Sequence, residues 1–232
     1  MLKVGLTGGI AAGKSVVGEM FMMMGARLVQ ADRIAHALMQ PGEAVYNEVV
    51  RHFGREILNR DGSVNREKLA EAAFGPAGAA EGKAANVAAP DAAAGNVPAG
   101  DVRPSRIGEL NRIVHPVVIR SQDAWMQEMG RQDPHAVAMV EAALILEAGA
   151  AEHFDRLIVV TCGAEQRVAR FAARQKIEVE AARKEVTRRM AAQLSDEEKM
   201  KAADYVIDNS GSLEQTRERV QGVWRELRRE AG

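Results

Sequence analysis

Short apolar runs separated by longer amphipathic stretches make up most of this chain. Each run is rich in aliphatic and β-branched residues and is followed by a stretch with helical periodicity. Buried strands of a parallel sheet have this continuous apolar character, because both faces of the sheet are covered. The alternation predicts an α/β fold built on a doubly wound parallel five-stranded sheet. The predicted strands are residues 2–7, 26–31, 136–140, 156–161 and 205–208.

The region between the second and third predicted strands, about residues 33–135, is expected to be mostly helical. A helical insertion of this size is suited to a substrate lobe beside the sheet, and the turn signal Asn-Arg-Asp-Gly at 59–62 divides it. The predicted helices of this region are residues 33–39, 44–53, 66–74 and 107–129.

One stretch of that region, residues 76–105, differs in composition. It contains 11 Ala, 4 Gly and 4 Pro among 30 residues, with little apolar bulk beyond alanine. Such a segment buries too little surface to offset the entropy lost on ordering. We interpret it as a flexible surface insertion and expect its deletion to leave activity largely intact.

The segment GGIAAGKS at residues 8–15 fits the phosphate-loop pattern G-x-x-x-x-G-K-[ST] at every fixed position. It lies between the first predicted strand and a predicted helix at 14–24, which is the context the pattern requires. Backbone N–H groups of such a loop and the positive end of the helix dipole bind phosphate. Lys14 is expected to reach the outer phosphates and Ser15 to ligate Mg²⁺. The predicted ATP-binding segment comprises Gly9, Ile10, Ala11, Ala12, Gly13, Lys14, Ser15 and Val16.

An aspartate directly follows the second predicted strand. Asp32 should lie at the carboxyl end of that strand, where open α/β sheets bind their ligands. A carboxylate there is able to accept the proton of an acceptor hydroxyl. Its position fits the N-cap of the next helix equally well, and the two roles are compatible.

A set of arginines follows the fourth predicted strand. Arg167, Arg170 and Arg174 share one helical face, and arginines stabilise the charge that spreads over a transferred phosphoryl group. Small-molecule kinases carry such residues on a mobile lid, here expected at about 164–193. A solvated basic face explains the spacing as well. No Asn-Lys-x-Asp guanine-reading signature occurs in the sequence, which disfavours a GTPase.

Composition narrows the class of protein further. A formal net charge of −1 disfavours broad nucleic-acid binding, and Cys162 as the single cysteine excludes an intrachain disulfide. No apolar run approaches the roughly 18 residues of a membrane span, and the first strand leaves no room for a signal peptide. We expect a cytoplasmic enzyme, monomeric or weakly self-associating, that binds small molecules rather than nucleic acid or membrane.

Motifs along nearly the whole chain resemble the dephospho-CoA kinase family of P-loop kinases. The resemblance begins with GLTGGIAAGKS at 5–15 and QAD at 30–32. It continues with Phe-Gly at 53–54, DGSVNR at 61–66, LNRIVHP at 110–116 and LILE at 144–147. It ends with a Q-x-x-x-R-x-x-x-R pattern at 166–174 and with ADYVIDN at 203–209.

This resemblance implies a P-loop kinase core at 1–32 and 136–232, a helical CoA-binding lobe at 33–135 and a small helical lid. It implies transfer of the ATP γ-phosphoryl group to the ribose 3′-hydroxyl of dephospho-CoA, the last step of coenzyme A synthesis. The roles that it implies are catalysis by Asp32, Lys14 and Arg170, ATP binding by Arg174 and Asn209, and acceptor binding by Asp32, His115 and Glu147.

Three departures from the family pattern bear on the site. Gln30 replaces the first acid of the usual pair, Ala143 stands where a proline usually precedes the leucine-rich turn, and residues 76–105 interrupt the acceptor lobe. Two other functions remain to be tested: a kinase of the same class that acts on a nucleoside or nucleotide, and a nucleotide-dependent regulatory switch that transfers no phosphoryl group.

Overall fold

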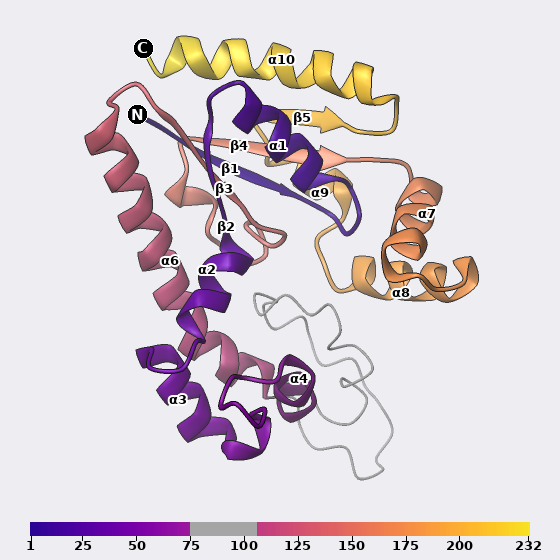
Figure 1. The fold of residues 1–232 in the computed structure, drawn as a ribbon. Helices are drawn as coiled ribbons and strands as arrows, with labels where there is room; N and C mark the ends of the chain where they lie inside the picture. The colour runs from indigo at the N-terminus through magenta and orange to yellow at the C-terminus, as the bar shows by residue number, and fades with distance from the viewer. Residues whose placement is uncertain (75–105) are drawn as a thin grey trace. The chain divides into compact units, whose positions relative to one another are not determined.

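The computed structural model of the chain describes residues 1–74 and 106–232 (Figure 1). The strands in these residues form one sheet with the order β2-β3-β1-β4-β5, and every paired edge is parallel. The predicted doubly wound sheet is therefore confirmed. Its strands are β1 (Leu2–Gly8), β2 (Arg27–Gln30), β3 (Val137–Glu141), β4 (Arg156–Thr161) and β5 (Tyr205–Asp208).

Strand β1 lies at the centre of the sheet. Val4 pairs with Met139 of β3 on one side and with Arg156 of β4 on the other. Strand order reverses at this point, because later segments of the chain add strands to both edges of β1. The crevice beyond the carboxyl end of such a central strand is where doubly wound sheets bind ligands. The loop that follows β1 opens there.

The chain folds into two compact units. The sheet unit comprises residues 1–30 and 123–232, and the helical unit comprises 31–122. Helix α6 begins in the helical unit and ends in the sheet unit. The helices are α1 (Lys14–Met23), α2 (Ala31–Leu38), α3 (Ala44–Phe53), α4 (Arg66–Phe74), α6 (Ile107–Gln132), α7 (Ala164–Gln175), α8 (Val179–Ala191), α9 (Asp196–Lys201) and α10 (Leu213–Glu230), with 3₁₀ turns η1 (Arg55–Ile57) and η3 (Ala151–His153).

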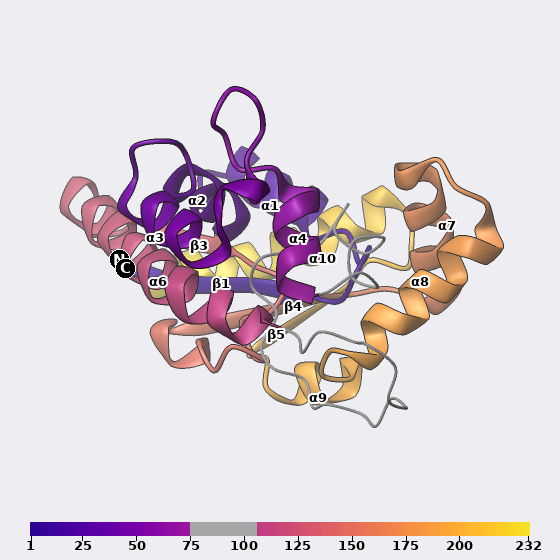
Figure 2. The same ribbon diagram turned by 90° about the horizontal axis from the view of Figure 1, so that it is seen from below.

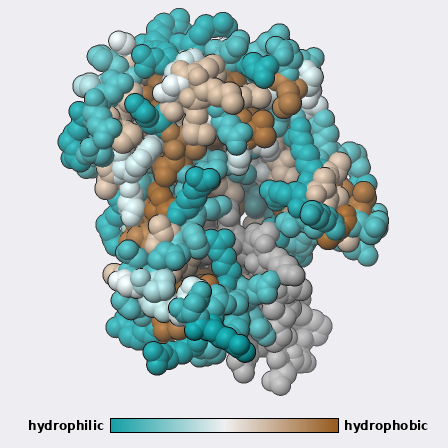
Figure 3. Space-filling view, in the orientation of Figure 1, coloured by the Kyte–Doolittle hydropathy of each residue, from teal (hydrophilic) through white to brown (hydrophobic). Residues whose placement is uncertain are grey.

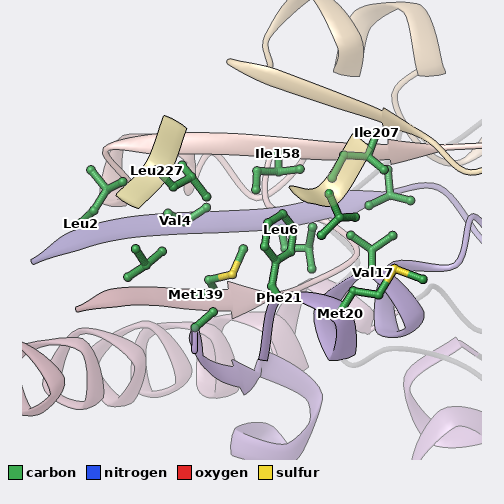
Figure 4. Close-up of a cluster of buried hydrophobic side chains, with 14 of the residues drawn as sticks. Leu2, Val4, Leu6, Val17, Met20, Phe21, Met139, Ile158, Ile207 and Leu227 are labelled. Atoms are coloured by element: carbon green, nitrogen blue, oxygen red, sulfur yellow. The ribbon is translucent and has the colours of Figure 1, made fainter. Parts of the chain in front are cut away.

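A hydrophobic core joins the sheet to helices α1 and α10 (Figure 4). Leu6 of β1 and Phe21 of α1 are fully buried in it, as are Ile158 of β4 and Leu227 of α10. Burying a side chain of this size contributes about 1.5–3 kcal/mol. The apolar face of α10 is therefore a packing surface. This core fixes α1, and with it the first turn that follows the loop after β1.

Two short polar motifs set where the last helices begin. Ser195 accepts a hydrogen bond from the backbone N–H of Glu198 while the Glu198 side chain accepts one from the Ser195 N–H. This reciprocal pair is a capping box, and it starts α9. Ser212 and Gln215 form the same reciprocal pair at the start of α10. Each pair satisfies backbone N–H groups that have no partner within the helix.

The helical unit has its own small core. Val45, Val49 and Phe53 of α3 are buried, and the Arg106 guanidinium lies 4.5 Å from the Phe53 ring centroid. The predicted turn at 59–62 is present, with the Asn59 N–H donating to the Ser63 carbonyl at 2.8 Å. Hydrogen bonds from the Ser63 hydroxyl and N–H lower the pKa of Asp61 in the same turn.

The two chain termini lie side by side in both ribbon views (Figures 1 and 2). The N-terminal ammonium of Met1 donates to the Pro134 carbonyl, and His135 bonds the Ala231 carbonyl at 3.0 Å. These contacts link the segment before β3 to the start of β1 and to the end of α10. They lie at the amino end of the sheet, opposite the end where the loop after β1 opens.

Most sequence predictions about the elements are confirmed. All five strands occur within a residue of their predicted bounds, and α3 and α4 have the predicted bounds. Helix α2 begins at Ala31, so Asp32 lies inside its first turn rather than capping it from outside. The predicted insertion 76–105 lies outside the described residues. Among the helices of the described part, none is both long enough and apolar enough to cross a membrane.

Candidate functional site

The loop between β1 and α1 has the close backbone packing of a phosphate-binding loop. Gly8 has φ +149°, and a Cβ added there would lie 2.1 Å from the Val160 carbonyl oxygen of β4. Gly13 has φ +95°, and a Cβ there would lie 2.1 Å from Asn209 Nδ2. Side chains at these two positions would therefore clash with neighbouring atoms. The glycines in the sequence pattern are required by the neighbours of the loop as well as by its curvature.

Lys14 folds along the inner side of this loop. Its Nζ donates to the carbonyl oxygens of Gly8 at 2.9 Å and Gly9 at 3.2 Å. Lys14 is also the first residue of α1, so its positive charge lies on the residue at the positive end of the helix dipole. Positive charge and a helix N-terminus together favour a phosphate group.

Ser15, the predicted Mg²⁺ ligand, donates a hydrogen bond from Oγ to Glu141 Oε1 at 2.7 Å. Glu141 is the last residue of β3 and is 8% exposed. Its second oxygen, Oε2, accepts a hydrogen bond from Gln30 Nε2 at 3.0 Å. A hydroxyl and a carboxylate oxygen side by side are the hard oxygen ligands that Mg²⁺ prefers. The residues present therefore fit a Mg²⁺ site.

Glu141 was missed by the sequence interpretation, although a signal for it was present. It directly follows the apolar run at 136–140. The same argument that selected Asp32, an acid at the carboxyl end of a buried strand, applies to Glu141. Gln30, which replaces an acid of the family pattern, also has a structural role here, because its side-chain amide donates a hydrogen bond to the Glu141 carboxylate.

Arg170 and Asn209 hold the outer side of the phosphate loop. Asn209 Nδ2 donates to the Ala12 carbonyl at 2.8 Å, and Arg170 Nη1 reaches the same oxygen at 3.4 Å. Arg170 Nη2 donates to the Asn209 carbonyl at 2.9 Å, and Asn209 Oδ1 accepts from Thr216 at 2.9 Å. The end of β5, helix α7 and the phosphate loop thus meet at one carbonyl group.

The α7–α8 hairpin, residues 164–191, covers the tip of the phosphate loop. Its buried side chains Val168, Phe171 and Val186 form a cluster, against which Ile10 and Ala11 of the loop pack. Arg174, by contrast, is exposed, and its guanidinium lies 5.7 Å from the Phe171 ring centroid. The face predicted to be basic therefore has a buried part at the loop and an exposed part beyond it.

The remaining predicted site residues lie apart from the phosphate loop in the sequence. Glu147 forms a buried ion pair with Lys199 at 2.7 Å, and its Oε1 also accepts from the Leu194 N–H at 3.2 Å. His115 is half-buried within α6, one residue before Pro116. Asp32 is exposed on α2. Asp32 and His115 belong to the helical unit, whereas Glu147 belongs to the sheet unit.

Comparison with known proteins decides the family. The family model described as dephospho-CoA kinase matches residues 2–86 and 103–215. The chain belongs to the dephospho-CoA kinase family. Members of this family are ATP-dependent kinases of coenzyme A biosynthesis, and the fold and donor-site loop of this chain agree with that class. The match omits residues 87–102, which fall inside the predicted insertion.

Individual relatives support the same assignment along the whole chain. The chain is 35% identical to the dephospho-CoA kinase of Syntrophotalea carbinolica over 220 residues, covering 95% of this chain and 89% of the relative. It is 32% identical to the dephospho-CoA kinase of Aquifex aeolicus over 230 residues, covering 99% and 100%.

Solved structures show the same fold. The TT1252 protein of Thermus thermophilus superimposes with a TM-score of 0.69 at 26% identity, covering 97% of both chains. The dephospho-CoA kinase of Campylobacter jejuni superimposes with a TM-score of 0.63 at 23% identity, covering 98% of both chains. At 23% identity the second likeness shows a shared fold.

Proposed function

We propose that this member of the dephospho-CoA kinase family transfers the γ-phosphoryl group of ATP to the ribose 3′-hydroxyl of dephospho-CoA, with Asp32 as the general base. The observation that carries the donor half of this proposal is the complete phosphate loop at the central strand, with Ser15 bonded to Glu141 at 2.7 Å. The acceptor half follows from membership of the family.

The donor phosphates bind in the loop of residues 9–16. Backbone N–H groups and the start of α1 hold the inner phosphates, and Lys14 turns from the loop carbonyls toward the outer ones. Arg170 and Arg174 lie on the helix that covers the loop, and from there they stabilise charge on the transferred group. Asn209 approaches the adenine base at the end of β5.

Mg²⁺ is the expected cofactor, held by Ser15 and Glu141. When bound, the ion neutralises charge on the β- and γ-phosphates and helps to align them. Glu141 supplies the carboxylate oxygen, and Gln30 orients that carboxylate through Oε2. Gln30 carries no charge itself, so this part of the site contributes one carboxylate rather than two.

Asp32 removes the proton of the acceptor hydroxyl as that oxygen attacks the γ-phosphorus. The bond from the γ-phosphorus to the β,γ-bridging oxygen breaks, and ADP is the leaving group. Chain connectivity supports this role. Gln30 ends β2 beside Glu141 in the sheet register, and Asp32 follows two residues later, a span of at most about 7 Å. Asp32 is solvent-exposed in the first turn of α2.

The acceptor is proposed to bind to the helical lobe of about 33–135, with contributions from His115 and Glu147. Glu147 contacts Lys199 and the Leu194 N–H, so it would act on the acceptor only by changing partners or through the segment that it anchors. We further propose that the enzyme works in the cytoplasm as a monomer or weak homo-oligomer.

The first test is an acceptor assay. Purified protein is incubated with ATP and Mg²⁺ and with dephospho-CoA, a nucleoside or a nucleoside monophosphate, and products are identified by mass spectrometry. We expect coenzyme A from dephospho-CoA and little turnover of the other acceptors. Turnover of a nucleoside alone would point to the related small-molecule kinase. Tight nucleotide binding without transfer to any acceptor would point to a regulatory switch.

The second test concerns the base. Asp32→Asn keeps the size of the side chain but accepts a proton poorly, so kcat should fall by about 10²–10⁴-fold while the Kd for ATP changes little. Stopped-flow or coupled assays give kcat, and calorimetry gives Kd. Asp133→Asn, which changes an exposed aspartate after α6, is the matched control and should leave kcat unchanged. A normal kcat in Asp32→Asn would refute the assignment.

A further inference from the structure

Arg167, on the first half of α7, is a buried charge beside the phosphate loop. Its side chain is 1% exposed, a value typical of a core residue rather than of a basic surface. Removing a guanidinium from water is costly unless it is paired and hydrogen-bonded. The hydrogen-bond and ionic partners of this guanidinium therefore indicate its function.

Two of the three guanidinium nitrogens have partners. Arg167 Nε donates to the Cys162 carbonyl at 3.2 Å, and Nη2 donates to Thr161 Oγ1 at 3.3 Å. Nη2 also forms an ion pair with Asp196 Oδ2 at the start of α9. These contacts fix the guanidinium between the end of β4 and α9.

The third nitrogen, Nη1, is buried and has no hydrogen-bond partner among the described residues. It lies against the phosphate loop, because a Cβ added to Gly9 would be 2.1 Å from it. A charged donor left unpaired in the interior is costly, so it calls for a functional explanation. Here the unpaired N–H faces the loop on which the donor phosphates bind.

The charge of Arg167 is only partly neutralised. Asp196 is its ionic partner, and that side chain is 27% exposed, so water screens the carboxylate while the guanidinium stays dry. Opposite charges in a dry interior act over longer distances than in water. A net positive potential therefore remains at Gly9, where Arg167 lies against the loop.

We propose that Arg167 is a positioning residue for the donor phosphates. It supports the loop at Gly9 and contributes positive charge to the phosphate site. The carboxylate of Asp196 partly offsets that charge and so sets the positive potential at the phosphates. The inference rests on the phosphate loop being the nucleotide site. It adds to that site a residue of α7 that acts through the loop, whereas Lys14 is part of the loop itself.

The test is the affinity of the full-length protein for MgADP, measured by calorimetry at two salt concentrations. Arg167→Met should raise the Kd about tenfold, the size expected for one charge-assisted hydrogen bond. Arg167→Lys, which keeps the charge but not the fork, should recover part of that loss. Arg183→Met, at an exposed arginine of α8, is the matched control and should leave the Kd unchanged.

Asp196→Asn tests the effect of charge separately. It provides a second test if the Arg167→Met protein does not fold. It preserves the shape and the acceptor oxygen but removes the negative charge, so MgADP should bind about threefold more tightly, with a steeper salt dependence. The Arg167 variants could instead bind MgADP with a Kd within twofold of wild type and unfold at a lower midpoint. That result would show that Arg167 has only a structural role. An unchanged or weaker affinity in Asp196→Asn would likewise overturn the charge argument. Failure of wild-type protein to bind MgADP would instead refute the phosphate-loop site itself.

Discussion

The α7–α8 hairpin has an inner side and an outer side, and its charged residues behave differently on each. On the inner side, half-buried Arg170 donates to carbonyl groups of the phosphate loop and of the residue after β5. On the outer side, Arg183 is 41% exposed and pairs with Glu165, which is 75% exposed. Spacing along the helices does not distinguish these arginines. Burial and the identity of the partner do.

The difference follows from solvation. An exposed ion pair contributes little net free energy to stability, because water screens the attraction and the long side chains lose conformational freedom when they pair. A buried charge has lost its water, so each remaining contact matters more. Over α7 and α8, hydrophilic and hydrophobic residues are mixed on the visible surface (Figure 3). That surface is suited to solvent, whereas the inner side is suited to holding the loop.

The same contrast extends beyond the hairpin, and the largest effect on stability is expected at a buried pair between α9 and the segment after β3. Lys199 and Glu147 are 1% and 5% exposed and 2.7 Å apart. Lys199→Met leaves the carboxylate buried and alone, so the free energy of unfolding should fall by about 3–5 kcal/mol. Urea unfolding measures it. Lys201→Met, at an exposed position of the same helix, is the control and should change stability by less than about 0.5 kcal/mol.

A small loss in Lys199→Met would mean that water reaches Glu147 more freely than its burial indicates. The contrast between buried and exposed charged pairs would then lose its strongest example.

A smaller effect on stability, but a clear one on catalysis, is expected for Arg170→Ala. It removes the donors to the Ala12 and Asn209 carbonyls and a charge near the transferred group. The ratio kcat/KM for ATP should fall by about 10²–10³-fold, as for loss of one transition-state donor. Arg174→Ala should lose less, because Arg174 is exposed. Steady-state kinetics compare the two, and equal losses would remove the distinction between them.

The smallest effect is expected on the outer side. The Arg183 guanidinium donates two hydrogen bonds to Glu165 and so lowers the pKa of that carboxyl. The pair therefore contributes stability above the unfolded-state pKa of Glu165, and this is lost as the pH falls through the lower folded-state pKa. In Arg183→Ala, NMR titration should show the Glu165 pKa returning to its ordinary value. Activity at neutral pH should be unchanged, and a large loss would place Arg183 in the catalytic site.

The elements of this fold were largely predictable because each depends on its own segment. Five apolar runs gave five strands, and Ser195 followed by Glu198 gave the start of α9. The phosphate loop was predictable for the same reason, since its glycines, lysine and serine are contiguous. The start of α2 was less predictable from the sequence, because the helix begins at Ala31 and includes Asp32 in its first turn.

The surroundings of the loop were not predictable in that way. Glu141 reaches Ser15 only because β3 pairs with β1, and Asn209 reaches Ala12 only because β5 ends beside the loop. The burial of Arg167 could not be read from its spacing, which an exposed basic face would share.

The sequence by itself determined the strand–loop–helix unit, the order of strands and helices, and the family, because local periodicity and contiguous motifs encode them. Only the tertiary structure decided which distant side chains surround that loop and which charges lose their water. Strand pairing joins residues more than a hundred positions apart, and the loss of water depends on everything packed around a group. No single segment of the chain contains that information.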